Sequence, residues 1–176
     1  MKLITIKILF LFCIISVFLS CNSQPVEKEK VHYPTPEETA QMNREWIEEE
    51  QLLINQFLKR KEWKMTESKS GLHYLIYQKG EGKQAKSGMQ AMVSYSVSLL
   101  NGKEIFNTKE TGPQAFLIEK DHVETGIHEG ITYMKVGDRA KIIIPPYLAH
   151  GLLGDKDKIP PMATLVFDLR LLGVSL

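Results

Sequence analysis

Two hydrophobic periodicities divide the chain. Between residues 35 and 64 the apolar side chains recur every three or four positions, which predicts an amphipathic helix. Thr35, Pro36 and Glu38 form a capping box at its start. The apolar stripe comprises Met42, Trp46, Ile47, Leu53, Ile54, Phe57 and Leu58, and Glu48 to Glu50 interrupt it. Such a helix could pack on the domain that follows, pair with a second copy or dock a partner, and the pattern does not choose among them.

From residue 68 onward the period changes to two. Residues 89–100 alternate cleanly, with Val93, Tyr95 and Val97 on one face and serines on the other, and the Asn101-Gly102 pair predicts a hairpin into residues 103–107. Further strands are expected at 71–80, 139–145 and 163–172. The apolar spacing of residues 123–134 fits the one helix expected here, which Thr125 would cap and Gly137 would follow. These elements predict an α+β fold in which an antiparallel half-barrel sheet wraps over one short helix.

The N-terminus has the pattern of an export signal. Lys2 and Lys7 precede the apolar run 8–19, which as a helix would span about 18 Å and is too short for a bilayer core of roughly 30 Å. Ser20 and Cys21 follow, and this ending resembles the lipobox of bacterial lipoproteins, in which the cysteine is lipidated. The alternative is a simple secretory peptide with an incidental cysteine. We therefore expect a signal peptide at 1–20, a polar tether at 21–34, the amphipathic helix at 35–64 and a folded domain at 68–176.

Composition narrows the classes of function. The 176 residues are 43% hydrophobic and 24% charged with a net charge of +1, which gives no reason to expect a nucleic-acid partner. Cys13 would leave with the signal peptide, so Cys21 would be the only cysteine left and no internal disulfide could form. His122, Glu124 and His128 superficially resemble metal ligands, but the two histidines would lie about 120° apart around a helix, and a solvated helix face is the preferred interpretation. We predict neither a metal nor a cofactor.

Four blocks in order carry a family resemblance. They are "SGLHYLIYQKGEGKQAKSG", "VSYSVSLLNGKEIFN", "GIHEGITYMKVGDRAKIIIPPYLAHG" and "IPPMATLVFDLRLL". Residues 68–173 resemble the FKBP-type peptidyl-prolyl cis/trans isomerases. With the lipobox and the helical lead-in, the whole chain most resembles the FKBP-type lipoproteins associated with gliding motility.

The resemblance implies an apolar cup that binds a prolyl residue. Its floor would be Ile127, and the backbone N–H of Glu124 would bind a substrate carbonyl. His150 takes the place of the family's lip aromatic residue, and Asn107 that of an acid. The walls would be Tyr95, Phe106, Val123, Ile159 and Phe167.

Three departures from the family pattern bear on activity. Asn107 replaces an aspartate, Ile127 is smaller than the tryptophan of the best-known members, and one residue is inserted between Gly102 and Phe106. We expect a modest isomerase, anchored to a membrane through Cys21 and facing the periplasm, that acts on proline-containing exported proteins and binds macrolide inhibitors. The alternative is a binding module or assembly factor that binds proline-containing segments without isomerising them.

Overall fold

The computed structural model describes residues 33–176. The predicted signal peptide, Cys21 and the tether up to residue 32 lie outside the described residues. The chain divides into two units, residues 1–39 and 40–176, and of the first only residues 33–39 are described. Among the helices of residues 33–176, none combines the length and apolarity that a bilayer crossing requires.

The long helix α2 (Pro36–Lys61) begins at the predicted capping box. The Glu38 N–H donates to the Thr35 hydroxyl at 3.2 Å, and the Thr35 N–H donates to the Glu38 carboxylate at 2.8 Å, which confirms that prediction. Lys59, Arg60 and Lys61 lie in the last turn, where positive charge is favourable. The helix ends three residues before the predicted boundary because Glu62 adopts a φ of 56°, outside the right-handed helical region.

The C-terminal half of α2 packs on the sheet. Ile54 and Phe57 are buried and form one cluster with Ile143 and Val166. The first of the three alternatives therefore holds for this half of the helix. The preceding turns of α2 are less covered, since the side chain of Ile47 is 48% exposed.

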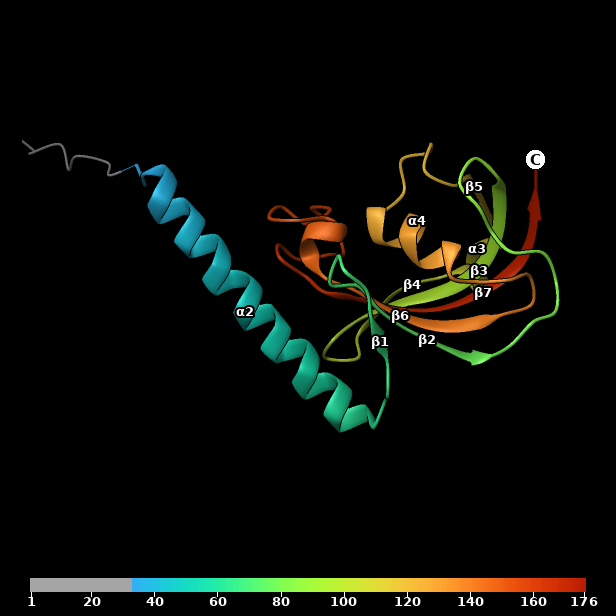
Figure 1. The fold of residues 1–176 in the computed structure, drawn as a ribbon, viewed down its shortest axis with the longest axis horizontal. Helices are drawn as coiled ribbons and strands as arrows, with labels where there is room; N and C mark the ends of the chain where they lie inside the picture. The colour runs from blue at the N-terminus through green and yellow to red at the C-terminus, as the bar shows by residue number, and fades with distance from the viewer. Residues whose placement is uncertain (1–32) are drawn as a thin grey trace, which may run out of the picture. The chain divides into compact units, whose positions relative to one another are not determined.

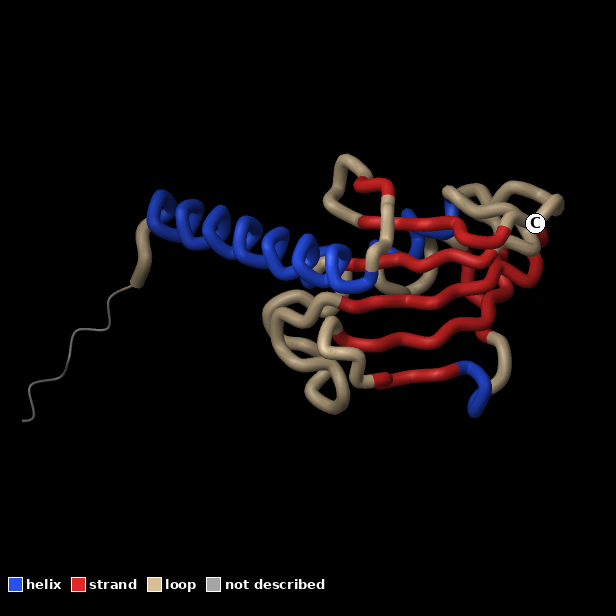
Figure 2. Tube along the Cα trace, turned by 90° about the horizontal axis from the view of Figure 1, so that it is seen from below, coloured by secondary structure: helices blue, strands red, loops and turns tan. Residues whose placement is uncertain are grey.

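A seven-stranded antiparallel sheet forms the body of the domain (Figures 1 and 2), which confirms the predicted fold class. Six strands follow the order β1-β2-β6-β7-β3-β4, and β5 pairs with β3. Their bounds are β1 (Thr66–Glu67), β2 (His73–Gln78), β3 (Gln90–Leu99), β4 (Glu104–Asn107), β5 (Gln114–Leu117), β6 (Arg139–Ile144) and β7 (Leu165–Ser175).

The short helix α4 (Thr125–Thr132) lies against one face of this sheet (Figure 1). Strand β6 explains how both helices are held. Side chains alternate along a strand, so Ile142 and Ile144 contact α4 while Ile143 reaches the opposite face and contacts the α2 cluster. All three isoleucines are fully buried, as expected for a strand that is covered on both faces.

Several elements differ from the prediction. Thr125 is the first residue of α4 rather than its cap, and Glu124 occupies the cap position without a side-chain capping bond. The prediction of a single helix after residue 68 was also wrong, because α3 (Thr108–Thr111) follows β4. Strands β1 and β5 were not predicted, since two- and four-residue strands carry almost no periodicity.

Close approach between α4 and β6 depends on Gly126. A Cβ added at this position would overlap the Ile144 side chain. We expect Gly126→Ala to destabilise the domain by about 1–2 kcal/mol, because overpacking costs about 1–3 kcal/mol and alanine regains up to about 1 kcal/mol of helix propensity. Urea unfolding measures the change.

Gly173→Ala is the matched control, because no atom of the described part of the chain lies within 4 Å of an added Cβ there. We expect it to change the free energy of unfolding by less than about 0.5 kcal/mol. A Gly126→Ala variant as stable as the parent would contradict the close packing of α4 on β6.

Candidate active site

Three aromatic side chains from three neighbouring strands line two adjoining hollows on the face of the sheet that carries α4. Tyr95 on β3 lies beside Phe106 on β4 and Phe167 on β7, with ring centroids separated by 5.3 Å and 5.5 Å. Strand register brings them together, because Val97 pairs with both Phe106 and Phe167 while Tyr95 lies two residues away on the same face. Phe167 is almost fully buried, whereas Tyr95 and Phe106 are partly exposed.

The inserted residue is accommodated by a β-bulge. Val97 pairs with Phe106 and Ser98 pairs with Glu104, so Ile105 is an extra residue on β4. Ile105 and Phe106 consequently both line the hollow. The insertion therefore adds an apolar group to the wall and leaves Phe106 beside Tyr95.

The site consists of two adjoining hollows that share Tyr95 and Glu124. The outer one has a volume of about 320 Å³ and is also lined by Phe106, His150 and Ile159. The inner one has a volume of about 130 Å³, and Val123, Ile127 and Phe167 line it. Ile127 is only 3% exposed and lies at the floor. The structure thus brings together eight of the nine predicted site residues.

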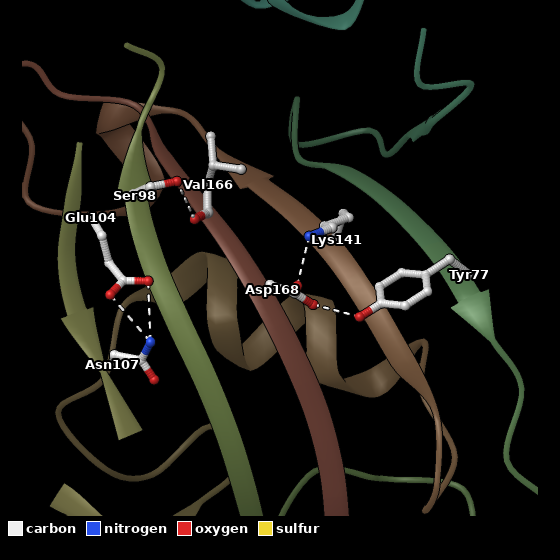
Figure 3. A network of polar contacts seen from close by, with 7 residues as sticks. All are labelled: Tyr77, Ser98, Glu104, Asn107, Lys141, Val166 and Asp168. Atoms are coloured by element: carbon white, nitrogen blue, oxygen red, sulfur yellow. Dashed lines mark hydrogen bonds and ion pairs between the residues drawn. The ribbon is translucent and has the colours of Figure 1, made fainter. Parts of the chain in front are cut away.

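Asn107 is the exception. It lines a polar hollow that borders the cup at Tyr95 and is also lined by Glu104, Arg139 and Asp168. Its amide donates to the Glu104 carboxylate at 3.1 Å, as Figure 3 shows, and its side-chain oxygen accepts from the Lys109 N–H and caps α3. Asn107 therefore lies beside the cup and lines neither of its two hollows.

The lip of the outer hollow follows strand β6. Pro145 and Pro146 end the strand as predicted, and the short 3₁₀ helix η1 (Pro146–Leu148) leads to His150. His150 Nε2 lies 3.1 Å from the Glu124 carboxylate. Because an ionised carboxylate only accepts, this contact places a proton on Nε2. The Nε2 proton of His150 is therefore already shared with Glu124.

A polar loop carries Ile159 to the edge of the outer hollow. The N–H groups of Asp157 and Ile159 donate to Asp155 Oδ1 at 2.9 Å and 2.7 Å. These backbone hydrogen bonds lower the pKa of the Asp155 carboxyl. The carboxylate that accepts them is therefore ionised at neutral pH. Asp155, Asp157 and Lys158 also line the outer hollow.

Tyr95 remains a neutral hydrogen-bond donor in this site. Burial raises the pKa of its hydroxyl, and the negative charge of Glu124 raises it further. The phenol is therefore fully protonated at neutral pH. Its ring supplies apolar wall, and its hydroxyl gives the cup one polar group that can donate.

His128 differs from the solvated residue that the sequence suggested. It is buried, and its Nδ1 accepts from the Glu119 N–H at 2.9 Å while Nε2 donates to the Asp121 carbonyl at 3.0 Å. Both ring nitrogens thus hold the segment before α4 in place. No group of acidic, histidine or cysteine side chains suited to a metal occurs within residues 33–176.

The backbone N–H of Glu124 can be tested separately from its side chain. Glu124 has a φ of −52°, which proline tolerates, and its N–H makes no hydrogen bond within residues 33–176. We expect Glu124→Pro to lower kcat/KM on a prolyl tetrapeptide by up to about tenfold, since one hydrogen bond is worth about 0.5–1.5 kcal/mol.

Glu124→Gln keeps the N–H and serves as the control. It should change kcat/KM by less than about threefold, because a neutral amide can still accept from His150. Equal losses in both variants would assign the effect to the side chain instead.

Sequence reasoning missed Ile105, Val97 and the residues of β5 that line the inner hollow. Val97 could have been found, because it alternates with Tyr95 on one face of β3. For Ile105 the signal was the insertion before Phe106, which indicates an extra residue on the strand but not which residue forms the bulge.

Comparison with known proteins identifies the family that this chain matches. Residues 81–172 match the family model described as FKBP-type peptidyl-prolyl cis-trans isomerase. A relative from Buchnera aphidicola (subsp. Acyrthosiphon pisum), named FKBP-type peptidyl-prolyl cis-trans isomerase FkpA, is 40% identical over 124 residues, which cover 70% of this chain and 50% of the relative. The Escherichia coli K12 protein of the same name is 39% identical over 109 residues, covering 61% of this chain and 39% of the relative. This chain therefore matches half or less of these relatives.

Solved structures agree with these matches. The crystal structure of FkpA from Escherichia coli aligns with a TM-score of 0.64 at 34% identity, covering 78% of this chain and 64% of that one. The N-terminal domain of FKBP42 from Arabidopsis thaliana aligns with a TM-score of 0.61 at 23% identity, covering 65% of this chain and 94% of that one. The second likeness concerns the fold alone.

Proposed function

Because this chain belongs to the FKBP-type peptidyl-prolyl cis-trans isomerase family, we propose that it catalyses the cis/trans isomerisation of prolyl peptide bonds in exported proteins. The observation that supports this most directly is the open hollow of about 320 Å³, which Tyr95, Phe106 and Ile159 line beside the inner floor. Isomerisation of prolyl bonds takes tens to hundreds of seconds and delays folding, so a catalyst of this step assists exported chains.

The chemistry requires differential stabilisation of a twisted amide. Rotation about the C–N bond has a barrier of about 18–20 kcal/mol because the planar amide loses its resonance. The twisted amide is less dipolar than the planar one, so an apolar cup favours it relative to water. A rate gain of roughly 10⁴ needs only about 5.5 kcal/mol, and shape and polarity can supply it without a nucleophile or a base.

Each part of the site has a place in this proposal. The rings of Tyr95, Phe106 and Phe167 hold the pyrrolidine ring away from water. The free N–H of Glu124 binds the carbonyl on one side of the rotating bond, which fixes that side while the other turns. His150, paired with Glu124, closes the lip from the strand-exit side.

We further propose that the protein is a lipoprotein held at an envelope membrane, facing the periplasm. The support is the sequence alone, in which Lys2, Lys7 and an apolar run precede Cys21. The lipid would serve as the anchor, and two or more acyl chains hold stably where one is marginal. Metabolic labelling with palmitate and membrane fractionation test this, with Cys21→Ser as the variant expected to lose both label and membrane association. The association with gliding motility stays a prediction from resemblance.

A second candidate is a proline-binding chaperone or assembly factor without isomerase activity. The floor of the inner hollow favours it, because Ile127 is aliphatic and offers a bound prolyl residue no aromatic ring, unlike the tryptophan of the best-known members. Asn107, at the position of a family acid, also removes a charge beside the cup.

A protease-coupled assay on a prolyl tetrapeptide separates the two candidates. We expect the full chain to accelerate isomerisation and FK506 to inhibit it; a relative from Rhizopus delemar, 38% identical over 113 residues that cover 64% of this chain and 29% of the relative, is named FK506-binding protein 4. An unchanged isomerisation rate together with measurable peptide binding would favour the second candidate.

A further inference from the structure

A second apolar hollow lies on the other side of the lip from the cup. It has a volume of about 310 Å³ and runs between helix α2 and the segment after β6. The side chains that line it are mainly apolar: Trp46, Ile47, Pro146, Tyr147, Leu152 and Met162. We call it the lip groove.

The lip groove is an exposed surface and not part of the packed core. Trp46 is 38%, Tyr147 50% and Leu152 58% exposed. The attachment of α2 to the sheet does not need these residues, because Ile54 and Phe57 provide it one to three turns farther along the helix. Contiguous exposed aromatic and aliphatic side chains of this kind mark a binding surface.

Glu50 gives the lip groove one polar feature. Its Oε1 atom is buried and has no hydrogen-bond partner among residues 33–176, and a buried acceptor left unpaired is unfavourable. Burial raises the pKa of this carboxyl, and the neighbouring Glu49 raises it further. An occupant that donates an N–H or a cationic group to Glu50 would satisfy the unpaired oxygen.

The acidic residues around the lip groove indicate which charge its occupant carries. Residues 44–50 carry four glutamates against one arginine. A second copy bound symmetrically would bring two acidic segments together, which is unfavourable, whereas a basic occupant would be attracted. The groove therefore fits a flexible segment that combines apolar and basic side chains.

Continuity with the cup identifies the source of that segment. His150 lines the outer hollow of the cup, and the next two residues, Gly151 and Leu152, line the lip groove. Likewise Ile159 lines the cup and Met162 the groove. A polypeptide with its proline in the cup has only this narrow lip to cross before it reaches the groove.

We propose that the lip groove binds the residues flanking the substrate proline, and that it selects unfolded segments carrying an aromatic or aliphatic residue next to a basic one. This rests on the proposed function, since it assigns the flanks of the same substrate. The cup turns the prolyl bond, and the groove raises the affinity for the chain that contains it.

Kinetics on two substrates test the inference. One substrate is a prolyl tetrapeptide, and the other extends it on one side by about ten residues, which reach roughly 33 Å, with a Phe-Arg pair at varied positions. We expect Trp46→Ala to raise KM for the best extended peptide about tenfold and to leave the tetrapeptide unchanged. Glu50→Gln should reduce the preference for Phe-Arg over Phe-Glu. Leu52→Ala is the matched control, because Leu52 is an exposed residue of the same helix outside the groove.

Direct binding keeps the inference separate from the isomerase assignment. Fluorescence anisotropy of a labelled extended peptide reports on the groove even if no tetrapeptide is turned over, in which case the isomerase assignment fails and a Trp46-dependent affinity still supports the groove. Equal KM and affinity in Trp46→Ala and the parent, or equal losses in Trp46→Ala and Leu52→Ala, would overturn the inference. So would a dimer, seen by sedimentation, that Trp46→Ala dissociates while peptide affinity stays unchanged.

Discussion

Tyr95→Ala is expected to lower kcat/KM on a prolyl tetrapeptide by about 10- to 100-fold, since loss of an apolar wall of this size removes about 1.5–3 kcal/mol. Tyr95 lines both hollows and lies within ring-contact distance of Phe106 and Phe167. In the proposed mechanism, removing its ring would admit water to the site at which the prolyl amide rotates. The tetrapeptide assay measures the effect, and circular dichroism shows whether the domain remains folded.

Tyr95→Phe separates the ring from the hydroxyl. It keeps the apolar wall, so we expect a loss of less than about tenfold, the share of one hydrogen bond. If Tyr95→Ala retained the activity of the parent, the two hollows would not be where the prolyl bond turns.

Phe167→Ala is expected to have the largest effect on stability. Phe167 is 2% exposed and packs in the core that joins sheet and α4, so its truncation should lower the free energy of unfolding by about 3–5 kcal/mol. A loss of this size is a large fraction of the 5–15 kcal/mol that stabilises a typical domain. Urea unfolding measures it, and activity lost in this variant would reflect a disturbed floor as well as lost contact.

Phe57→Ala tests whether that loss is specific to the cup. Phe57 is equally buried but lies on the opposite face of the sheet, in the cluster with Ile143 and Val166. We expect it to loosen α2 and to leave tetrapeptide turnover within about threefold of the parent. Equal loss of turnover in the two variants at matched folded fractions would show that the faces are not independent.

Much of the fold could be predicted from local patterns. The alternation of β3 placed Val93, Tyr95 and Val97 on one face, and the Asn-Gly pair located the turn into β4. The capping box located the start of α2 within one residue. These features depend on neighbours in sequence, which is why periodicity and turn chemistry were sufficient.

The remaining features depend on tertiary contacts. The direction of Asn107 follows from the bulge at Ile105 and from the α3 cap. The insertion before Phe106 indicates an extra residue and asparagine is a common cap, but neither pattern says which way the side chain turns once β4 pairs with β3. The burial of His128 depends on backbone groups of Glu119 and Asp121 that fold back over it. The family resemblance brought eight site residues together because the family's strand order sets their positions, and it could not show which way one rim residue turns.

The buried isoleucines of strand β6 determine how far the chain can be truncated from its N-terminus. Ile143 and Val166 face away from the cup and are covered by Ile54 and Phe57. A truncated protein that begins at residue 68 would expose this apolar face of the sheet to water. Exposed apolar strands of this kind promote self-association. A soluble catalytic fragment should therefore retain the final turns of α2, and insolubility after their removal would say nothing about catalysis.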